Sequence, residues 1–369
     1  MSLTNDLAVL GGTAATLNSS SFLRNRIING AMMIDQRNAG AAVNAPVSGS
    51  SYTTVDRWRV SNSTASAKFS TQRQVIANIP GAGFNLYTLN VTSLATTSLA
   101  AGDYYGINQF IEANNIGDLA WGTASAKTVT LSFYVYCSLT GTFGGAIRTG
   151  DGSNYSYPFS YTISAANTWT SISITIPGPT SGTWSTTGTG VGIDVWFSLG
   201  SGSSFRGTAG SWAAANYIAP TGETSVVGTN AATWYITGVQ LEVGSVATPF
   251  ERRQYGQELA LCQRYYYRLK AATSYANAGV GRAYSTTNCQ AFVAMPVSMR
   301  GAPTGSYSAL SDWNDSGGGT PSVIDPVSQY SGDYRQMTVN MTGTYASGQA
   351  IALNANNTTN AWMAWSAEL

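Results

Sequence analysis

Histidine is absent from the 369-residue sequence, and charged residues of both signs are scarce. Without histidine, Ser-His-Asp and Cys-His catalysis and every histidine-ligated metal site are excluded. Charged side chains make up 9% of the chain, against about 25% in an ordinary soluble domain. The formal net charge of +1 offers no strong field to nucleic acid or to an anionic membrane. We therefore expect no nucleic-acid binding, although a carboxylate-pair enzyme is not excluded.

Cysteine is rare, and long apolar runs are missing. Cys137, Cys262 and Cys289 are widely spaced, and no two of them have the spacing of a zinc or redox motif. We expect three reduced, mostly buried thiols. The opening residues, MSLTNDLAVLGGTAATLN, carry neither the basic leader nor the apolar core of a signal peptide, and no window has the length of a transmembrane helix. The sequence thus predicts synthesis in a cytoplasm and no membrane insertion.

Strand signals dominate what is present. Apolar and polar side chains alternate from Thr128 to Cys137, and the alternation recurs in Ile172–Ile176 and Val191–Leu199. Between Trp234 and Val243 the apolar positions change parity at Gly238, which predicts a β-bulge. Turns rich in Gly, Ser, Thr and Asn separate these runs, with no helical crossovers. The pattern predicts an all-β fold, a sandwich or jelly roll.

Two stretches interrupt the strand pattern. Gln257–Leu269 has apolar residues at three-to-four spacing, which predicts a short amphipathic helix. Asp312–Gly332 is rich in Gly, Ser, Asp and Pro, which predicts an exposed loop. We therefore expect an extended N-terminal arm (1–25), a large β-sandwich (26–253), a helical linker (254–270) and a smaller C-terminal β-sandwich domain (271–369).

Three blocks of the sequence contain distinctive motifs. They are NRIINGAMMIDQRNAG with the later VDRW (25–40 and 55–58), WYITGVQLEVGSVATPFERR (234–253) and YGQELALCQRYYY (255–267). In this order, and across residues 25–268, the blocks resemble a β-sandwich module of bacteriophage tail-fibre and tail proteins. The residues after 269 resemble the C-terminal domain that often follows this module. The resemblance implies a jelly roll like that of carbohydrate-binding modules, on a virion appendage that is commonly trimeric.

From this resemblance we expect a bacteriophage virion structural protein of the tail-fibre or receptor-binding type. It would attach to the host-cell surface, through a glycan or a surface protein, as a homotrimer in the virion. Residues 1–25 would bind other tail or head proteins, and the C-terminal domain would lie outward. One alternative is a purely architectural head-fibre, decoration or baseplate component without receptor binding. Another is a polysaccharide depolymerase, although the scattered acids show no candidate dyad, so we expect no catalysis.

Aromatic side chains in loops are candidates for binding sugars, because their flat apolar faces suit sugar C–H groups. Trp313 lies in LSDWNDSGGGTPS, in the longest loop expected in the C-terminal domain, with no obvious core to join. The candidate ligand-binding residues are Trp313 with Asp312 and Asn314, and Tyr307, Tyr330 and Tyr334. In the larger sandwich, Trp212 and Tyr217 are interpreted as structural.

No organic cofactor is expected, and structural calcium has only weak candidates. Asp312, Asn314 and Asp315 offer oxygens but lack the spacing of an EF-hand. The family resemblance implies that such sandwiches often hold an ion, and the carboxylates near the two ends of the larger sandwich are Asp35, Asp56, Glu242 and Glu251. No ligand spacing supports either set, so the sequence predicts no metal site.

Overall fold

The computed structural model describes residues 24–76, 79, 87–150, 155–316, 319–330 and 334–369. The expected arm therefore lies outside the described residues as far as residue 23. The chain divides into two units, which are residues 1–35 with 40–253 and residues 36–39 with 254–369. The chain is nearly all β, as the sequence predicts.

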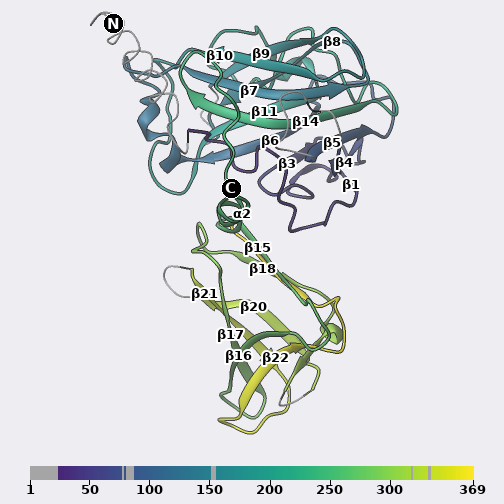
Figure 1. Ribbon diagram of the computed structural model, residues 1–369, viewed down its shortest axis with the longest axis vertical. Coiled ribbons are helices and arrows are strands. Elements are labelled where there is room, and N and C mark those ends of the chain that lie inside the picture. Colours follow the sequence, from purple (N-terminus) through teal and green to yellow (C-terminus); the bar gives the residue numbers. More distant parts are fainter. Residues whose placement is uncertain (1–23, 77–78, 80–86, 151–154, 317–318, 331–333) are drawn as a thin grey trace, which may run out of the picture. The chain divides into compact units, whose positions relative to one another are not determined.

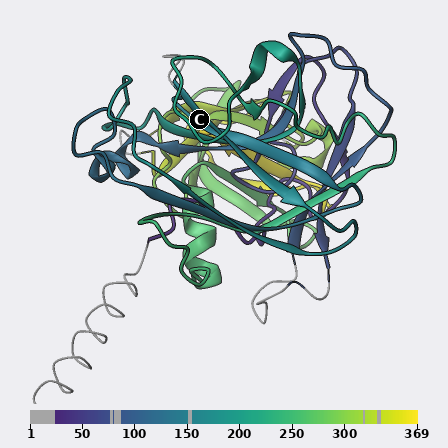
Figure 2. The same cartoon turned by 90° about the horizontal axis from the view of Figure 1, so that it is seen from above.

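The first unit is a jelly-roll β-sandwich of two six-stranded antiparallel sheets. In spatial order, the β14 sheet consists of β1 (Val43–Asn44), β4 (Phe69–Val75), β5 (Tyr87–Ser93), β14 (Thr233–Val243), β7 (Val129–Cys137) and β10 (Thr170–Ile176). The β11 sheet consists of β2 (Gly49–Ser51), β3 (Arg59–Asn62), β6 (Tyr104–Glu112), β11 (Val191–Ser201), β8 (Gly141–Arg148) and β9 (Ser156–Ile163). Figures 1 and 2 show these strands from two directions.

Alternation along the strands builds the core between these sheets. Side chains of a strand point to opposite faces in turn, so the apolar set of β7 and that of β11 both face inward. Phe133 of β7 meets Phe197 of β11 with ring centres 5.1 Å apart, and Trp58 and Trp234 are fully buried beside them. The strands predicted from period-two alternation are confirmed.

A β-bulge in β14 is the point where the N-terminal segment joins the sandwich. Gly238 has φ +61°, and the β14–β7 register shifts between Thr237 and Gln240, which confirms the predicted bulge. β5 pairs with β14 only as far as Ile236. Beyond the bulge, residues 25–30 occupy that edge: Arg26 N donates to Leu241 O at 2.9 Å, and Val239 N donates to the carbonyl of Gly30 at 3.0 Å.

Short elements complete the first unit. They are η1 (Ala113–Asn115), η2 (Gly117–Leu119), η3 (Ser203–Phe205), and β12 (Arg206–Gly207) in parallel pairing with β13 (Ala219–Pro220). Residues of η3 and β13 pack over the outer face of the β11 sheet.

The second unit begins with α2 (Tyr255–Gln263) and contains two sheets. One sheet has the order β15 (Tyr266–Lys270), β23 (Trp362–Ser366), β18 (Thr304–Tyr307). The other has the order β19 (Trp313–Asp315), β22 (Ala350–Ala355), β16 (Asn277–Ala283), β17 (Asn288–Ala294), β21 (Gln336–Thr342), β20 (Val323–Tyr330), and η4 (Leu310–Asp312) precedes β19. Their inner faces enclose a separate core of Trp, Met and small residues.

Two sequence predictions about this unit are wrong. The helix ends at Gln263 rather than Leu269, because Tyr266–Lys270 forms β15 and pairs residue by residue with β23. The stretch predicted as a loop over Asp312–Gly332 contains β19 and β20, which pair with β22 and β21. In both places, hydrogen bonding to a distant strand overrides the local pattern.

The three cysteines are buried and free, as the sequence predicts. Burial raises the pKa of the Cys137 thiol to about 11, so this thiol stays protonated and unreactive. Among the described residues, no helix is both long enough and apolar enough to cross a membrane.

Candidate functional site

A tryptophan on the outer face of the β11 sheet marks the candidate site. Ile193, Val195 and Phe197 of β11 point into the sandwich core, so Trp196 belongs to the opposite face. Its side chain is nevertheless only 2% exposed, because a second, smaller apolar cluster covers it. Ile218, just before β13, and Ala219, its first residue, form this cluster with Trp196, and two further aromatic rings pack against it.

A glycine on the neighbouring strand makes room for the Trp196 indole. In the β6–β11 ladder, Trp196 lies opposite Asn108, two residues from Gly106. A Cβ atom at Gly106 would lie 2.6 Å from Trp196 Nε1, closer than real contacts allow. The absence of a side chain at Gly106 therefore lets the indole lie against the sheet.

The aromatic cluster borders a pocket of about 260 Å³. This is just below the range of about 300–1,000 Å³ that is usual for small-ligand sites. Tyr104 meets Trp196 edge-on at 6.3 Å and Phe205 at 5.6 Å between ring centres. The pocket is lined by Ser50, Arg59, Tyr104, Arg148, Trp196, Phe205, Asn216 and Ile218.

A buried carboxylate fixes the position of one arginine in this lining. Arg148 Nε donates to Asp194 Oδ2 at 2.8 Å, and its guanidinium lies 5.0 Å from the Trp196 ring centre. The other carboxylate oxygen of Asp194 accepts a hydrogen bond from Asn108 Nδ2 at 2.7 Å. Arg148 also donates to Asn216 Oδ1, on the segment that leads into β13. The pocket wall is thereby held across β6, β11, β8 and the covering loop.

Two buried polar atoms at this site lack a hydrogen-bond partner among the described residues. They are Trp196 Nε1, a donor, and Asn108 Oδ1, an acceptor, on directly opposed positions of β11 and β6. Leaving such a group unsatisfied costs about 1–3 kcal/mol. The arrangement suits a small ligand with one apolar face and several hydroxyl groups.

The residues predicted as ligand-binding from the sequence lie elsewhere, in the second unit. Trp313 is 2% exposed and belongs to the core, so the expectation that it stands in an exposed loop is wrong. Tyr307 and Tyr334 are partly buried against the same core. Asp312 ends η4, and Asn314 is the middle residue of β19. Tyr330 ends β20, and its side chain lies outside the described part of the chain.

Alternation in β19 explains this correction. Trp313 and Asp315 point inward, while Asn314 lies between them on the other face. Asp315 is buried, and its Oδ2 accepts a hydrogen bond from the Tyr345 hydroxyl at 2.8 Å. The three oxygen-bearing residues from Asp312 to Asp315 therefore do not converge as a calcium loop would require.

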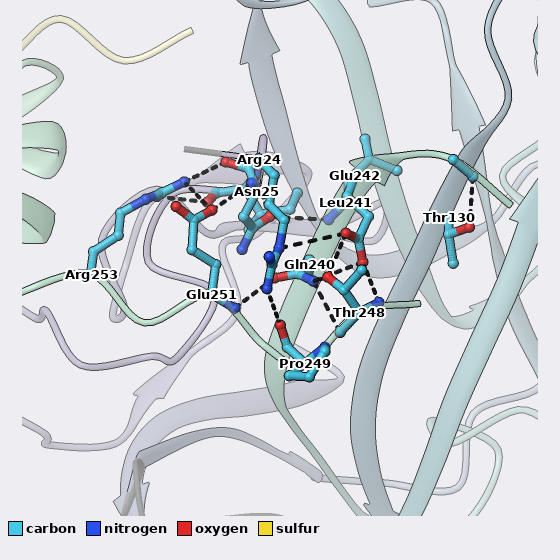
Figure 3. Close-up of polar contacts among 12 residues, drawn as sticks. Arg24, Asn25, Thr130, Gln240, Leu241, Glu242, Thr248, Pro249, Glu251 and Arg253 are labelled. Carbon is cyan, nitrogen blue, oxygen red and sulfur yellow. Dashed lines mark hydrogen bonds and ion pairs between the residues drawn. The ribbon is translucent and has the colours of Figure 1, made fainter. Parts of the chain in front are cut away.

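Two of the carboxylates near the ends of the sandwich, Glu242 and Glu251, contact protein donors in Figure 3. Glu242 accepts from Gln240 Nε2 at 2.8 Å and from Thr248 N and Oγ1 at 2.8 and 2.6 Å. Glu251 Oε2 accepts from Asn25 N at 2.7 Å and lies 3.8 Å from Arg253. Asp35 accepts from Gly40 N at 2.7 Å, and Asp56 is fully buried. Within the described residues, no group of three or more Cys, Asp or Glu side chains is placed to hold a metal ion.

The aromatic residues interpreted as structural pack within the first unit. The Trp212 ring stacks on Tyr155 at 5.6 Å, lies 5.6 Å from Trp121, and donates through Nε1 to Pro177 O at 2.7 Å. The Tyr217 ring lies over Gly207, where a Cβ would come within 2.3 Å of it.

Sequence reasoning missed the pocket, although one signal for it was present. In β11 the apolar residues occupy odd positions, and Trp196 stands at an even position between Asp194 and Ser198. A large aromatic residue on the polar face of an alternating strand needs a partner outside the core. Sequence alone does not reveal that Tyr104, Phe205 and Ile218 provide it, because they come from three distant segments.

Comparison with known proteins gives similarity at the level of solved structures. No protein-family model and no curated protein sequence matches the chain. A putative sugar-binding protein from Bacteroides thetaiotaomicron aligns with 60% of this chain and 100% of its own, at 11% identity and a TM-score of 0.34. A structure described as a family 4 carbohydrate-binding module aligns over 58% of this chain and 98% of its own, at 15% identity and a TM-score of 0.29.

A bacteriophage protein is also among the similar structures. The enzymatically active domain of bacteriophage CBA120 tailspike protein 4 aligns over 60% of this chain and 22% of its own, at 11% identity and a TM-score of 0.29. At such low identities and TM-scores these similarities carry no functional conclusion, so the function of the chain has to be inferred from its own pocket.

Proposed function

We propose that the chain is a glycan-binding protein and that the pocket on the outer face of the β11 sheet is its binding site. The observation that carries this proposal is the combination of aromatic walls, Tyr104, Trp196 and Phe205, with arginine and amide side chains in one pocket. Tyr104 and Phe205 offer partly exposed rings for the C–H face of a sugar. Arg148, Asn216 and Ser50 supply polar groups for its hydroxyls.

We propose binding without cleavage. Glycoside hydrolysis needs two carboxylates about 5–10 Å apart. The lining, as far as the described residues show it, contains no Asp or Glu, and both oxygens of the neighbouring Asp194 are engaged by Arg148 and Asn108. This favours an adhesive role over the depolymerase alternative.

The biological setting that we propose is a bacteriophage virion, with the chain as a tail-fibre or receptor-binding protein that holds host surface glycans. The sequence blocks within residues 25–268 support this setting. A homotrimer would multiply a weak single-site contact. An apolar pair on the second unit supports self-association: Val280 and Phe292 oppose each other across β16 and β17 and are 61% and 39% exposed.

Glycan binding is tested with purified protein on a glycan array and on cells of the host. Tyr104→Ala removes an aromatic wall, and Tyr284→Ala is the matched control, an exposed tyrosine of the second unit. We expect the wild type and the control to bind the same glycans and to block virus adsorption, and Tyr104→Ala to bind at least about tenfold more weakly. If the wild type binds neither glycan nor cell at saturating concentration, the proposal fails and the architectural role becomes the better one.

A further inference from the structure

The charge of the pocket points to the class of sugar. Two arginines, Arg59 and Arg148, line it, and none of the described lining residues is a carboxylate. The negative charge of the buried Asp194 is matched by Arg148 at 2.8 Å. Within the described part of the chain, the positive charge of Arg59 therefore has no counter-charge at the site.

Arg59 is held in place without being neutralised. It stands on β3 opposite Asn108 of β6, and its guanidinium lies 4.9 Å from the centre of the Phe110 ring. Among the described residues, no acid pairs with it and no acceptor hydrogen-bonds to its guanidinium. Other arginines of the chain do pair with acids, namely Arg24, Arg26, Arg37, Arg73, Arg148, Arg206 and Arg253. In a chain with so few charges, an ordered and unpaired guanidinium beside a pocket is suited to an anionic ligand.

We propose that the pocket selects a sugar that carries a carboxylate, such as a uronic acid residue; this rests on the proposed glycan binding. The planar fork of N–H groups on Arg59 matches a carboxylate in geometry and charge. The rings of Tyr104 and Phe205 take the apolar face of the same sugar. Donors outnumber acceptors in this lining, which disfavours a neutral sugar relative to an acidic one.

The test compares acidic oligosaccharides with neutral copies of themselves. Oligomers of galacturonate, glucuronate and mannuronate, and their carboxyl-reduced forms, are titrated into the full chain by calorimetry. We expect at least one acidic oligomer to bind about tenfold or more tightly than its reduced form, as a charge-assisted hydrogen bond implies. The difference should shrink as salt is raised.

Variants identify the residue responsible. Arg59→Gln should weaken binding of the acidic oligomer about tenfold and weaken binding of its reduced form much less. Because no acid among the described residues pairs with Arg59, the substitution leaves no buried carboxylate without its partner. This variant is therefore expected to fold, which circular dichroism checks. Arg282→Gln, at an exposed arginine of β16, is the matched control and should change neither affinity.

The outcomes separate this inference from the proposed function. Equal affinity of the wild type for acidic and reduced oligomers overturns the acidic preference and leaves glycan binding in place. An equal loss for both forms in Arg59→Gln assigns Arg59 a packing role and also overturns the inference. If the wild type binds no acidic oligomer but does bind neutral glycans on the array, the inference fails alone. If it binds no glycan of either kind, the proposed function fails as well.

Discussion

Asn25 joins the N-terminal segment to the bulged strand, and its replacement by alanine should destabilise the first unit. The Asn25 side chain is buried and makes three hydrogen bonds to the main chain. Its Oδ1 accepts from Leu241 N and from Ile27 N, both at 3.0 Å, and its Nδ2 donates to Val239 O at 3.1 Å (Figure 3). Two of these bonds satisfy backbone groups of Val239 and Leu241, in the part of β14 that does not pair with β5.

The loss of stability in Asn25→Ala follows from the backbone groups that lose their hydrogen-bond partner. Each buried backbone group that loses its partner costs about 1–3 kcal/mol, and water entering the space of the lost amide recovers part of this. We therefore expect Asn25→Ala to lower the free energy of unfolding by about 2–4 kcal/mol. Urea unfolding followed by tryptophan fluorescence measures this as a lower midpoint at an unchanged slope.

The control is Asn230→Ala, at an exposed asparagine whose side chain makes no hydrogen bond within the described residues. It should change the stability by less than about 0.5 kcal/mol. A loss of that small size in Asn25→Ala as well would refute the reasoning, because it would mean that the segment over the bulge is not held by this side chain.

Three further predictions follow from buried groups. Burial raises the pKa of the Glu223 carboxyl above its ordinary value of 4.5, so its contribution to stability is present below that pH and is lost as the pH rises through the folded-state pKa. Glu223→Gln should therefore become more stable relative to the wild type as the pH is raised from 4.5. Calorimetry measures the melting temperatures of both proteins against pH, and a constant difference between them would contradict this prediction. The three buried thiols, Cys137, Cys262 and Cys289, should resist a thiol reagent in the native protein and react after unfolding; rapid labelling of native protein would show that one is accessible. Trp313→Ala should destabilise the second unit by about 3–5 kcal/mol and leave glycan affinity unchanged. A loss of affinity without a loss of stability would instead show that the glycan-binding site lies in the second unit.

The sequence predicts the sandwich well because its strands are amphipathic. Period-two alternation in β7, β10 and β11 marks the apolar face that each strand turns to the core, and this is a local property, although the other face of β11 is covered as well. The parity change at Gly238 likewise locates a bulge without any knowledge of the partner strand. These features follow from the chain itself and need no long-range information.

The errors arise where a distant strand decides the conformation. Tyr266 and Leu269 have helical spacing, yet they lie in β15 and pair with β23 in a sheet. Trp313 lies among polar and glycine residues that are typical of a loop, yet β22 pairs with it and a core receives its ring. The pocket could not be predicted because its walls come from β2, β3, β6, β8, β11, η3 and the segment before β13, which only the topology brings together.

The central claim is that the pocket beside Trp196 binds a sugar, and the indole N–H resonance of that residue tests it most directly. In ¹⁵N-labelled protein this resonance is assigned from its absence in Trp196→Phe. Because the Trp196 side chain lines the pocket, a bound sugar should shift this resonance in a saturable manner. The indole of Trp212, which already donates to Pro177 O, should stay in place. A saturable glycan titration that leaves Trp196 unmoved and shifts the indole of Trp313 would contradict the account.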